Sequence, residues 1–204
     1  MAVKSRQAQH SASTRAALLR VARRMFAEHG YSATATEEVV RRARVTRGAL
    51  YHHFRDKKDL FIAVMDEEQK KLAAKAAEAA STQPDAWSAM LAGANAFLDA
   101  CLDHAVQQIV LIDAPAVLGL ERWREADQSY YLANTKAAIE AAIAQGLVEP
   151  QPVAPLAHIL MGALNEAAML IAHADDEVAA RRDVSGVVER LFNGLRGKPE
   201  AIAN

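Results

Sequence analysis

Residues 34–65 read TATEEVVRRARVTRGALYHHFRDKKDLFIAVM, and this stretch decides the fold of the first part of the chain. Two short amphipathic helices separated by a tight turn are predicted here, each opening on a threonine. Thr34 with Glu37 has the spacing of a capping box, which predicts a helix over about 35–42. Thr46 is a second N-cap residue and predicts the next helix. The pattern is typical of a helix-turn-helix, which places its second helix in the major groove of DNA.

The second of these helices has two chemically different sides. Leu50 and Phe54 are four residues apart, so they share a face that is expected to point into the protein. Gly48 costs a helix about 1 kcal/mol relative to Ala, so its presence suggests that a backbone approaches something closely there. The outward side carries a cation, a position without a side chain, a phenol and an imidazole, which are Arg47, Gly48, Tyr51 and His52.

On these residues the segment resembles the DNA-binding domain of the TetR family of bacterial transcriptional regulators. The resemblance runs from about Arg15 to Met65 and rests on four groups of residues, which are Ala22, Phe26 and Gly30-Tyr31, then Ala33-Thr34, then GALYHHF at 48–54, then KKDL at 57–60. It implies base contacts from Arg47 and from the backbone at Gly48. It also implies phosphate contacts, from Thr36, Thr46, Tyr51, His52, His53 and Lys57.

One residue departs from the family pattern. The family usually has Gly in the turn where this chain has Arg44. If that position is left-handed, an arginine there costs about 1–2 kcal/mol. A phosphate contact from the added cation would offset that cost, so Arg44 joins the candidate DNA-binding residues.

Composition indicates an all-α protein. Hydrophobic residues make up 51% of the 204, alanine is abundant, and only six Pro and nine Gly interrupt the chain. No β-branched or aromatic run alternates over more than a few positions, so strands are not expected. About nine helices are expected, at about 13–28, 35–42, from Thr46, 57–80, 84–103, 105–112, 120–145, 153–174 and 177–195.

These helices predict two domains with a short extension at each end. Residues 1–12 are expected to form a disordered arm and residues 13–58 a three-helix DNA-binding domain. The helix that begins at 57 connects this domain to residues 59–197, a ligand-binding and dimerisation domain, and residues 198–204 are expected to fray.

Charge divides along the same line. Residues 1–58 hold 13 Lys and Arg against 4 Asp and Glu, whereas residues 59–204 hold 11 against 21. A net charge of −1 for the whole chain hides this asymmetry. A basic DNA-binding head on an acidic regulatory body would have this distribution, because only the head needs to neutralise phosphates.

Periodicity and the resemblance together predict a small-molecule pocket in the second domain. Trp123, Asp127, Tyr130 and Asn134 fall along one stripe of a helix, and His158, Met161 and Asn165 fall along one stripe of another. Apolar walls with a few polar groups are typical of a ligand cavity, although such stripes also occur in plain protein cores. The candidate ligand-binding residues are Phe97, Trp123, Asp127, Tyr130, Asn134, His158, Met161 and Asn165.

A dimer interface is predicted from the last two helices. The helix over 153–174 is apolar nearly all round, which indicates burial on more than one side. The resemblance implies a four-helix bundle formed by two chains. The candidate interface residues are Gly162, Ala163, Ala167, Val188, Leu191 and Phe192.

The favoured hypothesis is a homodimeric repressor that binds an inverted-repeat operator in double-stranded DNA and is released by a small-molecule inducer. Inducer binding would tilt the connecting helix and change the spacing of the two heads. No cofactor, metal, catalytic residue or membrane partner is expected, and no apolar stretch reaches the 18–20 residues of a membrane span. The single Cys101 fits a bacterial cytoplasm, where the protein is expected at the nucleoid when it is bound to DNA.

Two other hypotheses remain open. The first is a helical enzyme that uses a metal or acid–base chemistry, with ligands drawn from five histidines, which are His52, His53, His104, His158 and His173. None of these pairs has a metal-ligand spacing such as HExxH. The second is an architectural DNA-coating protein without a ligand, which would show weak sequence preference.

Overall fold

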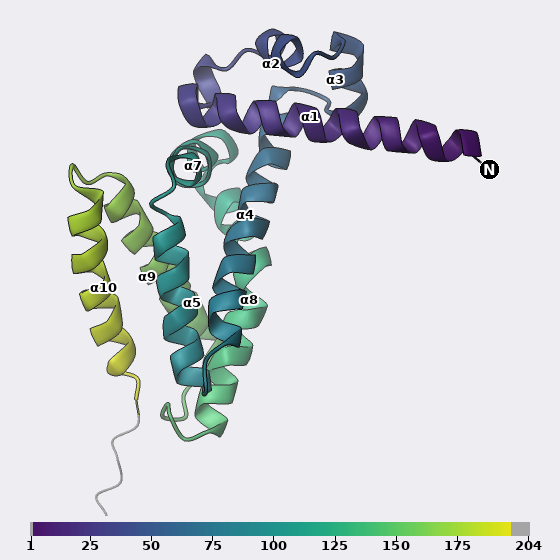
Figure 1. Ribbon diagram of the computed structural model, residues 1–204. Coiled ribbons are helices and arrows are strands. Elements are labelled where there is room, and N and C mark those ends of the chain that lie inside the picture. Colours follow the sequence, from purple (N-terminus) through teal and green to yellow (C-terminus); the bar gives the residue numbers. More distant parts are fainter. Residues whose placement is uncertain (1, 197–204) are drawn as a thin grey trace, which may run out of the picture. The chain divides into compact units, whose positions relative to one another are not determined.

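The computed structural model describes residues 2–196, and in that range it is all-helical, apart from one isolated bridge between Val148 and Arg196 (Figure 1). The predicted fold class is therefore confirmed. The contacts between residues group the chain into two compact units that interleave in sequence. The first unit consists of residues 1–69 and 104–123, and the second of residues 70–103 and 124–204. The predicted functional division after residue 58 stays a prediction.

The first unit is built on α1 (Ala2–Ala33), against which α2 (Thr36–Ala43) and α3 (Arg47–His53) pack. The unit also contains the first part of α4 (Lys57–Ser81), where Asp56 accepts a hydrogen bond from the backbone nitrogen of Asp59 at 2.8 Å. That contact makes Asp56 the N-cap of α4 and confirms the predicted start of this helix at residue 57.

The helix α1 begins at Ala2, so the prediction of a disordered arm over residues 1–12 is wrong from residue 2 onward. Residues 2–29 contain no Pro or Gly and are rich in Ala and Arg, so nothing in the sequence stops the helix from extending backward. The predicted frayed tail, residues 198–204, lies outside the described residues.

The core of the first unit is a cluster of three aromatic rings. Phe26, which is fully buried, lies edge-on to Phe61 with 5.1 Å between ring centroids and stacks against Tyr31 at 6.0 Å. Tyr31 and Phe61 also meet edge-on at 5.1 Å. Edge-to-face pairs add stability beyond the area they bury. This cluster fixes the end of α1 against the start of α4.

Gly30 breaks α1 one turn before its end. Its φ of +73° is left-handed and interrupts the helix two residues after the predicted end at about residue 28, although the chain makes one more helical turn through Ala33. The first backbone nitrogen of that turn, on Tyr31, donates to the carboxylate of Asp113 at 2.7 Å. A carboxylate at a helix start satisfies a backbone donor that has no partner within its helix.

Asp113 belongs to a segment that was predicted as one short helix. The structure has three consecutive elements there, α6 (His104–Val106), a π-helix η1 (Gln107–Asp113) and α7 (Ala114–Leu118). The predicted helix ended at about residue 112, but the chain continues into α7, where Pro115 lies in the first turn and its missing N–H would have no helical partner anyway.

The second unit contains the remainder of α4 and four other helices. These are α5 (Ala86–Ala100), α8 from residue 124 onward (the whole helix is Leu120–Ala144), α9 (Val153–Ala172) and α10 (Glu177–Asn193). Arg181 of α10 ties that helix to α5, with an ion pair to Asp99 at 2.8 Å and a hydrogen bond to the carbonyl of Asn95 at 3.0 Å.

By length and composition, the helix α9 is long and apolar enough to cross a bilayer. The helix α5 and the 104–118 segment meet the same criterion only when they are taken together as one sharply bent pair. The sequence prediction that no stretch reaches that length is therefore wrong. Core helices of soluble proteins pass the same test, and α9 packs on α10 and α5 through buried residues such as Leu160 and Ile171.

Candidate nucleic-acid interface and ligand pocket

The orientation of α3 is set by its cap and by two apolar anchors. The hydroxyl of Thr46 accepts a hydrogen bond from the backbone nitrogen of Ala49 at 3.1 Å, so Thr46 is the N-cap that the sequence predicts. Leu50 is fully buried and Phe54 is nearly so. The opposite side of α3 is solvent-exposed and carries the four predicted residues, Arg47, Gly48, Tyr51 and His52.

The exposed side of α3 combines a cation with an aromatic ring. The Arg47 guanidinium lies 5.6 Å from the centre of the Tyr51 ring, and its only ion pair in the described part of the chain is a loose one, 3.8 Å from Glu37. The Arg47 side chain is 70% exposed, so this pair holds it weakly. An exposed guanidinium beside a phenol can reach base edges and phosphates when a groove covers this face.

Gly48 faces open space. A Cβ built at this position would meet only the hydroxyl oxygen of Thr46, at 3.9 Å, so no packing inside the described structure requires a glycine here. The glycine therefore fits the prediction that DNA approaches the backbone closely at this point.

We expect Gly48→Ala to change stability and DNA affinity in opposite directions. The alanine should raise the free energy of unfolding by about 0.5–1 kcal/mol, because it removes backbone freedom from the unfolded chain. Affinity for DNA should fall, because the new methyl group lies where a phosphate or base edge would approach. Urea unfolding and fluorescence anisotropy on the same preparation measure the two effects, and an alanine variant that is stabilised and binds normally would contradict the close approach.

Arg44 has the left-handed conformation that its place in the turn suggested, with φ 56° and ψ 40°. It is the one non-glycine residue with positive φ among residues 2–196. Its backbone nitrogen donates to the carbonyl of Arg41 at 3.2 Å, which closes the end of α2. Its side chain is exposed, so the strain of about 1–2 kcal/mol is not offset by packing.

The capping box predicted at the start of α2 is wrong. Thr34 is buried, and its hydroxyl donates to the carbonyls of Gly30 at 2.8 Å and Met25 at 3.1 Å. The N-cap residue is Ala35, which makes no side-chain cap, and α2 begins at Thr36. The Thr34 hydroxyl is therefore engaged with carbonyls of α1 and does not cap α2.

Two predicted phosphate contacts are partly engaged within the protein. The Lys57 ammonium donates to the carbonyl of Ser32 at 3.2 Å and lies 4.4 Å from the centre of the Tyr31 ring. Burial lowers the pKa of Lys57, with Asp113 acting in the opposite direction. Burial also lowers the pKa of His53, so its imidazole is mostly neutral at pH 7 and attracts a phosphate less.

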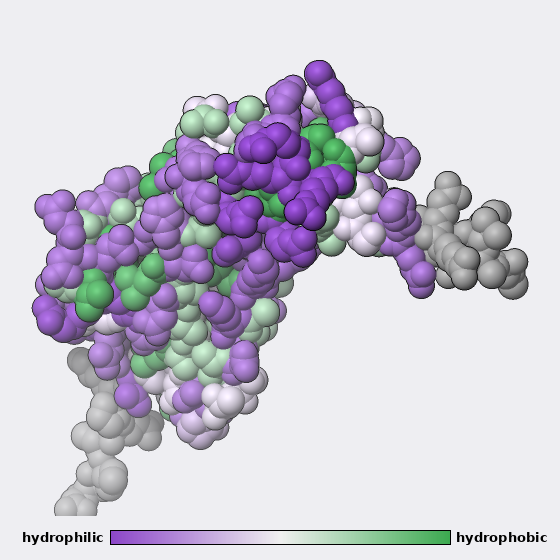
Figure 2. Space-filling view, turned by 45° about the horizontal axis from the view of Figure 1, so that its top comes forward, coloured by the Kyte–Doolittle hydropathy of each residue, from purple (hydrophilic) through white to green (hydrophobic). Residues whose placement is uncertain are grey.

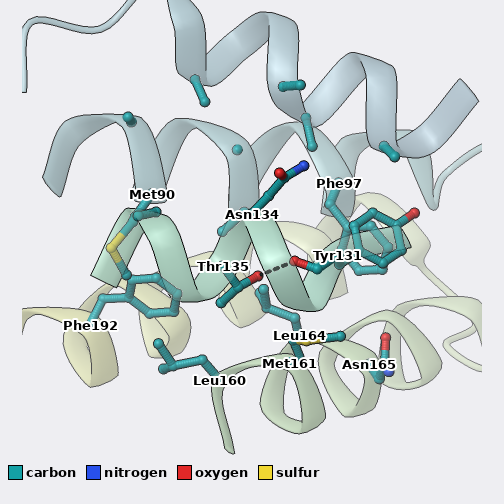
Figure 3. Close-up of a pocket in the computed structure, with 18 of the residues that line it drawn as sticks. Met90, Phe97, Tyr131, Asn134, Thr135, Leu160, Met161, Leu164, Asn165 and Phe192 are labelled. Atoms are coloured by element: carbon teal, nitrogen blue, oxygen red, sulfur yellow. Dashed lines mark hydrogen bonds between the residues drawn. The ribbon is translucent and has the colours of Figure 1, made fainter. Parts of the chain in front are cut away.

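The second unit contains a cavity of about 490 Å³, shown in Figure 3. Five of the eight predicted ligand-binding residues line it, and they come from three helices. These residues are Phe97, Asp127, Asn134, Met161 and Asn165. The volume is within the range of small-molecule sites, so the cavity is a candidate site.

The other three predicted pocket residues do not line the cavity. Trp123 is buried in the first unit, where its indole nitrogen donates to the carbonyl of Val110 at 3.0 Å. His158 is exposed, and Tyr130 is replaced at the wall by its neighbour Tyr131. The predicted stripe of α8 was counted from Trp123 in steps of seven and eleven residues. That stripe is rotated by part of a turn from the side of α8 that lines the cavity.

A stripe counted from Asp127 would have found the missing wall of α8. Residues at spacings of four, seven, eight and eleven from Asp127 all line the cavity, and these are Tyr131, Asn134, Thr135 and Ala138. The cavity is also lined by alanines of α4, by Met90 of α5, by Leu160 and Leu164 of α9 and by Phe192 of α10. Of these, the alanines and the two leucines carried no distinguishing signal in the sequence.

The cavity has an aromatic end with a polar group beside it. Phe97 and Tyr131 meet edge-on at 5.9 Å, and Figure 3 places them at one end, with Met90 and Phe192 at the other. Asn165 donates to the carboxylate of Asp127, which is buried, at 2.9 Å. Burial is the main cause that raises the pKa of Tyr131, and the negative charge of the nearby Asp127 raises it further, so the phenol stays protonated. The wall can therefore accept apolar groups and form hydrogen bonds at one end.

The exposed apolar face of α9 and α10 differs from the predicted dimer residues. Ala167, Val188 and Phe192 are buried within the chain, and Ala163 is half-buried. Gly162 has open space around its Cβ position, and Leu191 is 55% exposed. Other large apolar side chains that are exposed on these two helices are Ile159 at 66%, Leu170 at 57%, Val178 at 73% and Val187 at 50%.

This α9/α10 face, defined by Ile159, Gly162, Leu170, Val187 and Leu191, is the candidate interface. Ile159, Gly162 and Leu170 are spaced by three and eight residues, which keeps them on one side of α9. An α-helix that is apolar all round gives no periodic signal for which side faces the partner, so the sequence pattern chose the inner side at several positions.

In the part of the chain that the structure describes, no group of three or more His, Cys, Asp or Glu side chains is placed to hold a metal ion. The adjacent His52 and His53 rings meet edge-on at 5.2 Å. Cys101 is buried, and burial raises the pKa of its thiol to about 12, so it is protonated and unreactive at neutral pH.

Both units match family models. Residues 18–64 match the model described as bacterial regulatory proteins, tetR family, and residues 87–195 match the one described as tetracyclin repressor-like, C-terminal domain. A crystal structure of a TetR-family transcriptional regulator from Pectobacterium atrosepticum is 34% identical and superposes with a TM-score of 0.82, over 94% of this chain and 98% of that one.

Curated relatives match to different extents. The transposon Tn10 TetC protein of Escherichia coli is 27% identical over 162 residues, which cover 78% of this chain and 80% of that protein. The HTH-type transcriptional repressor Rv1474c of Mycobacterium tuberculosis is 42% identical over 65 residues, 32% of this chain and 35% of that protein. The second similarity is therefore local and covers a small part of either protein.

Proposed function

Because the chain belongs to the TetR family of bacterial regulatory proteins and is a DNA-binding transcriptional regulator, we propose that it is a homodimeric repressor. It binds an inverted-repeat operator in double-stranded DNA and is released by a small-molecule inducer. The observation that carries the proposal is the outer side of α3, where Arg47 and Tyr51 are exposed while Leu50 and Phe54 anchor the helix from behind.

The reading of DNA follows from that geometry. Arg47 contacts a base edge, and the backbone at Gly48 lies against the groove. Thr36, Thr46, Tyr51 and His52 lie on or beside the exposed face and contact phosphates. His53 and Lys57, which are engaged within the protein, contribute less.

A homodimer is supported by the α9/α10 face and by the needs of DNA recognition. Exposed leucine, isoleucine and valine side chains gather on these two helices. One recognition helix covers too few base pairs for useful specificity, and a two-fold axis doubles the contacts. The two-fold symmetry of the protein is then matched by the inverted repeat of the operator.

The inducer occupies the cavity of the second unit, whose walls are formed by α4, α5, α8, α9 and α10. Two covalent routes lead from these walls to the first unit. The first is α4 itself, and the second is the 104–123 segment, which connects α5 to α8 and belongs to the first unit with α1. An inducer shifts the balance between DNA-bound and free forms only by its differential affinity for the two conformations.

The protein works in the bacterial cytoplasm, at the nucleoid when bound, without a cofactor, a catalytic step or a membrane partner. Several relatives are named as transcriptional regulators or repressors, which supports this assignment over the enzyme hypothesis.

Selection of bound duplexes from a random library tests the proposal. We expect a single motif with two inverted half-sites, because two α3 helices read two major-groove segments about one helical turn, or a multiple of it, apart. A library that yields only weak composition bias would favour the architectural DNA-coating hypothesis instead.

On the selected operator, Arg47→Ala is expected to weaken binding by about 1–3 kcal/mol and to relax the preference at one base pair per half-site. Arg55→Ala is the matched control, because Arg55 is also exposed but pairs with Asp59 at 3.4 Å at the start of α4. Anisotropy titrations against single-base operator variants measure both effects. An Arg47→Ala specificity profile equal to that of the wild type would remove α3 from the groove.

A further inference from the structure

The first unit contains a second concave feature, a cleft of about 670 Å³ between α1 and the end of α2. Figure 2 shows strongly hydrophilic side chains gathered over this unit. The charged side chains of the cleft are five arginines and one glutamate, which are Arg20, Arg23, Arg24, Arg42, Arg44 and Glu28. Such an excess of cations in a hollow requires anions for neutralisation.

Three of the five arginines have no partner for their charge among the described residues. Arg23 pairs with Glu68 at 2.8 Å, and Arg42 pairs with Glu38 at 2.6 Å. The side chains of Arg20, Arg24 and Arg44 form no ion pair or hydrogen bond with any part of the chain that the structure describes. These three unpaired guanidinium groups are referred to below as the arginine triad.

The conformation of Arg44 adds an independent observation. Its φ of 56° is strained for any residue with a side chain, whereas Gly would adopt it without cost. A strained residue at the edge of a cleft indicates that its side chain is needed there, because nothing else in the turn requires an arginine.

Two members of the arginine triad, Arg20 and Arg24, lie on α1, apart from the outer side of α3, and Arg44 lies in the turn that ends α2. Within the first unit, α2 and α3 lie on the same side of α1 (Figure 1), and Leu50 points from α3 into the core that α1 helps to form. A duplex read by the outer side of α3 is therefore separated from α1 by about one helix diameter, roughly 10 Å. Arg20 and Arg24, one turn apart on α1, face a different ligand.

We propose that the arginine triad binds a compact polyphosphate group, such as the phosphate chain of a nucleotide. Guanidinium groups bind phosphate oxygens through paired hydrogen bonds, and three of them match the three or more negative charges of such a chain. The cleft volume is in the range of small-molecule sites. The site would be separate from the inducer cavity, which is in the other unit.

The test is calorimetric titration of the full-length protein with inorganic tripolyphosphate at constant ionic strength, without DNA. We expect tripolyphosphate to bind at least about tenfold more tightly than sulfate, since it engages several guanidinium groups at once. The double variant Arg20→Ala with Arg24→Ala should lose at least about tenfold in affinity for tripolyphosphate.

Arg44→Gly is a second test variant, and it should lose affinity for tripolyphosphate without losing stability. It should raise the melting temperature by about 2–4 °C, because the strain is relieved, while tripolyphosphate affinity falls several-fold. A variant that gains stability and binds tripolyphosphate normally would show that Arg44 takes no part in the site. Arg182→Ala, an exposed arginine of α10, is the control for loss of one positive charge and should leave the affinity unchanged.

Two results would overturn the proposal. The first is binding of tripolyphosphate no tighter than that of sulfate. The second is a set of triad variants that bind tripolyphosphate like the wild type but lose affinity for every duplex tested, which would assign the cleft to the DNA backbone. Neither result affects the operator assay with Arg47→Ala, so failure of this site is separable from failure of the proposed function.

Discussion

A protein with glutamate in place of both Ile159 and Leu170 is expected to be monomeric at concentrations where the wild type is a dimer. These two side chains are the most exposed large apolar groups on α9, at 66% and 57%, and a two-fold axis brings each of them into the interface twice. Burying an unpaired polar group costs about 1–3 kcal/mol by mutational data, and more for a carboxylate, so four of them should raise the dissociation constant at least about 1000-fold.

Light scattering during gel filtration measures this change as a halved mass. Because a monomer can contact only one half-site, its affinity for the operator should fall steeply. The helical content measured by circular dichroism should stay the same. The matched control is Leu120→Glu, an apolar residue of α8 with 51% exposure that lies outside the α9/α10 face. A double variant that keeps the dimer mass would place the interface elsewhere.

The second large effect concerns the aromatic cluster of the first unit. Phe26→Ala is expected to lower the free energy of unfolding by about 3–5 kcal/mol, because Phe26 is fully buried and its ring contacts both Tyr31 and Phe61. A domain is stable by only about 5–15 kcal/mol, so the loss is a large fraction of the total. DNA binding should fail at temperatures where the second unit is still folded.

Urea unfolding followed by circular dichroism measures the loss for Phe26→Ala. Tyr31→Phe is the control, since it keeps the ring in the cluster and removes only the hydroxyl, and it should change the free energy of unfolding by less than about 1.5 kcal/mol. A loss below about 1 kcal/mol for Phe26→Ala would mean that the three rings do not carry the stability of this unit.

The sequence predicted α3 well because the signals at this helix are local. Thr46 caps it, Leu50 and Phe54 anchor it, and the polar residues on the other side have no competing role. Local signals misled at Thr34, where the spacing to Glu37 suggested a cap. The hydroxyl of Thr34 instead donates to the carbonyls of Gly30 and Met25 in α1. A tertiary demand therefore overrode the local pattern.

Features that depend on residues distant in sequence could not be predicted. The contact of Asp113 with Tyr31 spans 82 residues, and nothing in the local sequence of either residue indicates the other. On α9, apolar residues on every side hide which side faces inward, so Ala167 and Phe192 of α10 were assigned to the interface although they are buried in the chain. Two of the four residues predicted for the pocket on α8 line the cavity, because the predicted stripe was counted from Trp123, which belongs to the first unit.

The packing of the 104–123 segment on α1 has a consequence for exchanging parts between regulators of this kind. A chimera that joins residues 1–69 to a foreign body would lose the carboxylate that completes the last turn of α1 and would uncover the apolar surface that Ile109, Val110 and Leu111 help to bury. The transplantable DNA-binding module of this protein is therefore discontinuous, and a graft that keeps its operator specificity must carry both pieces of chain.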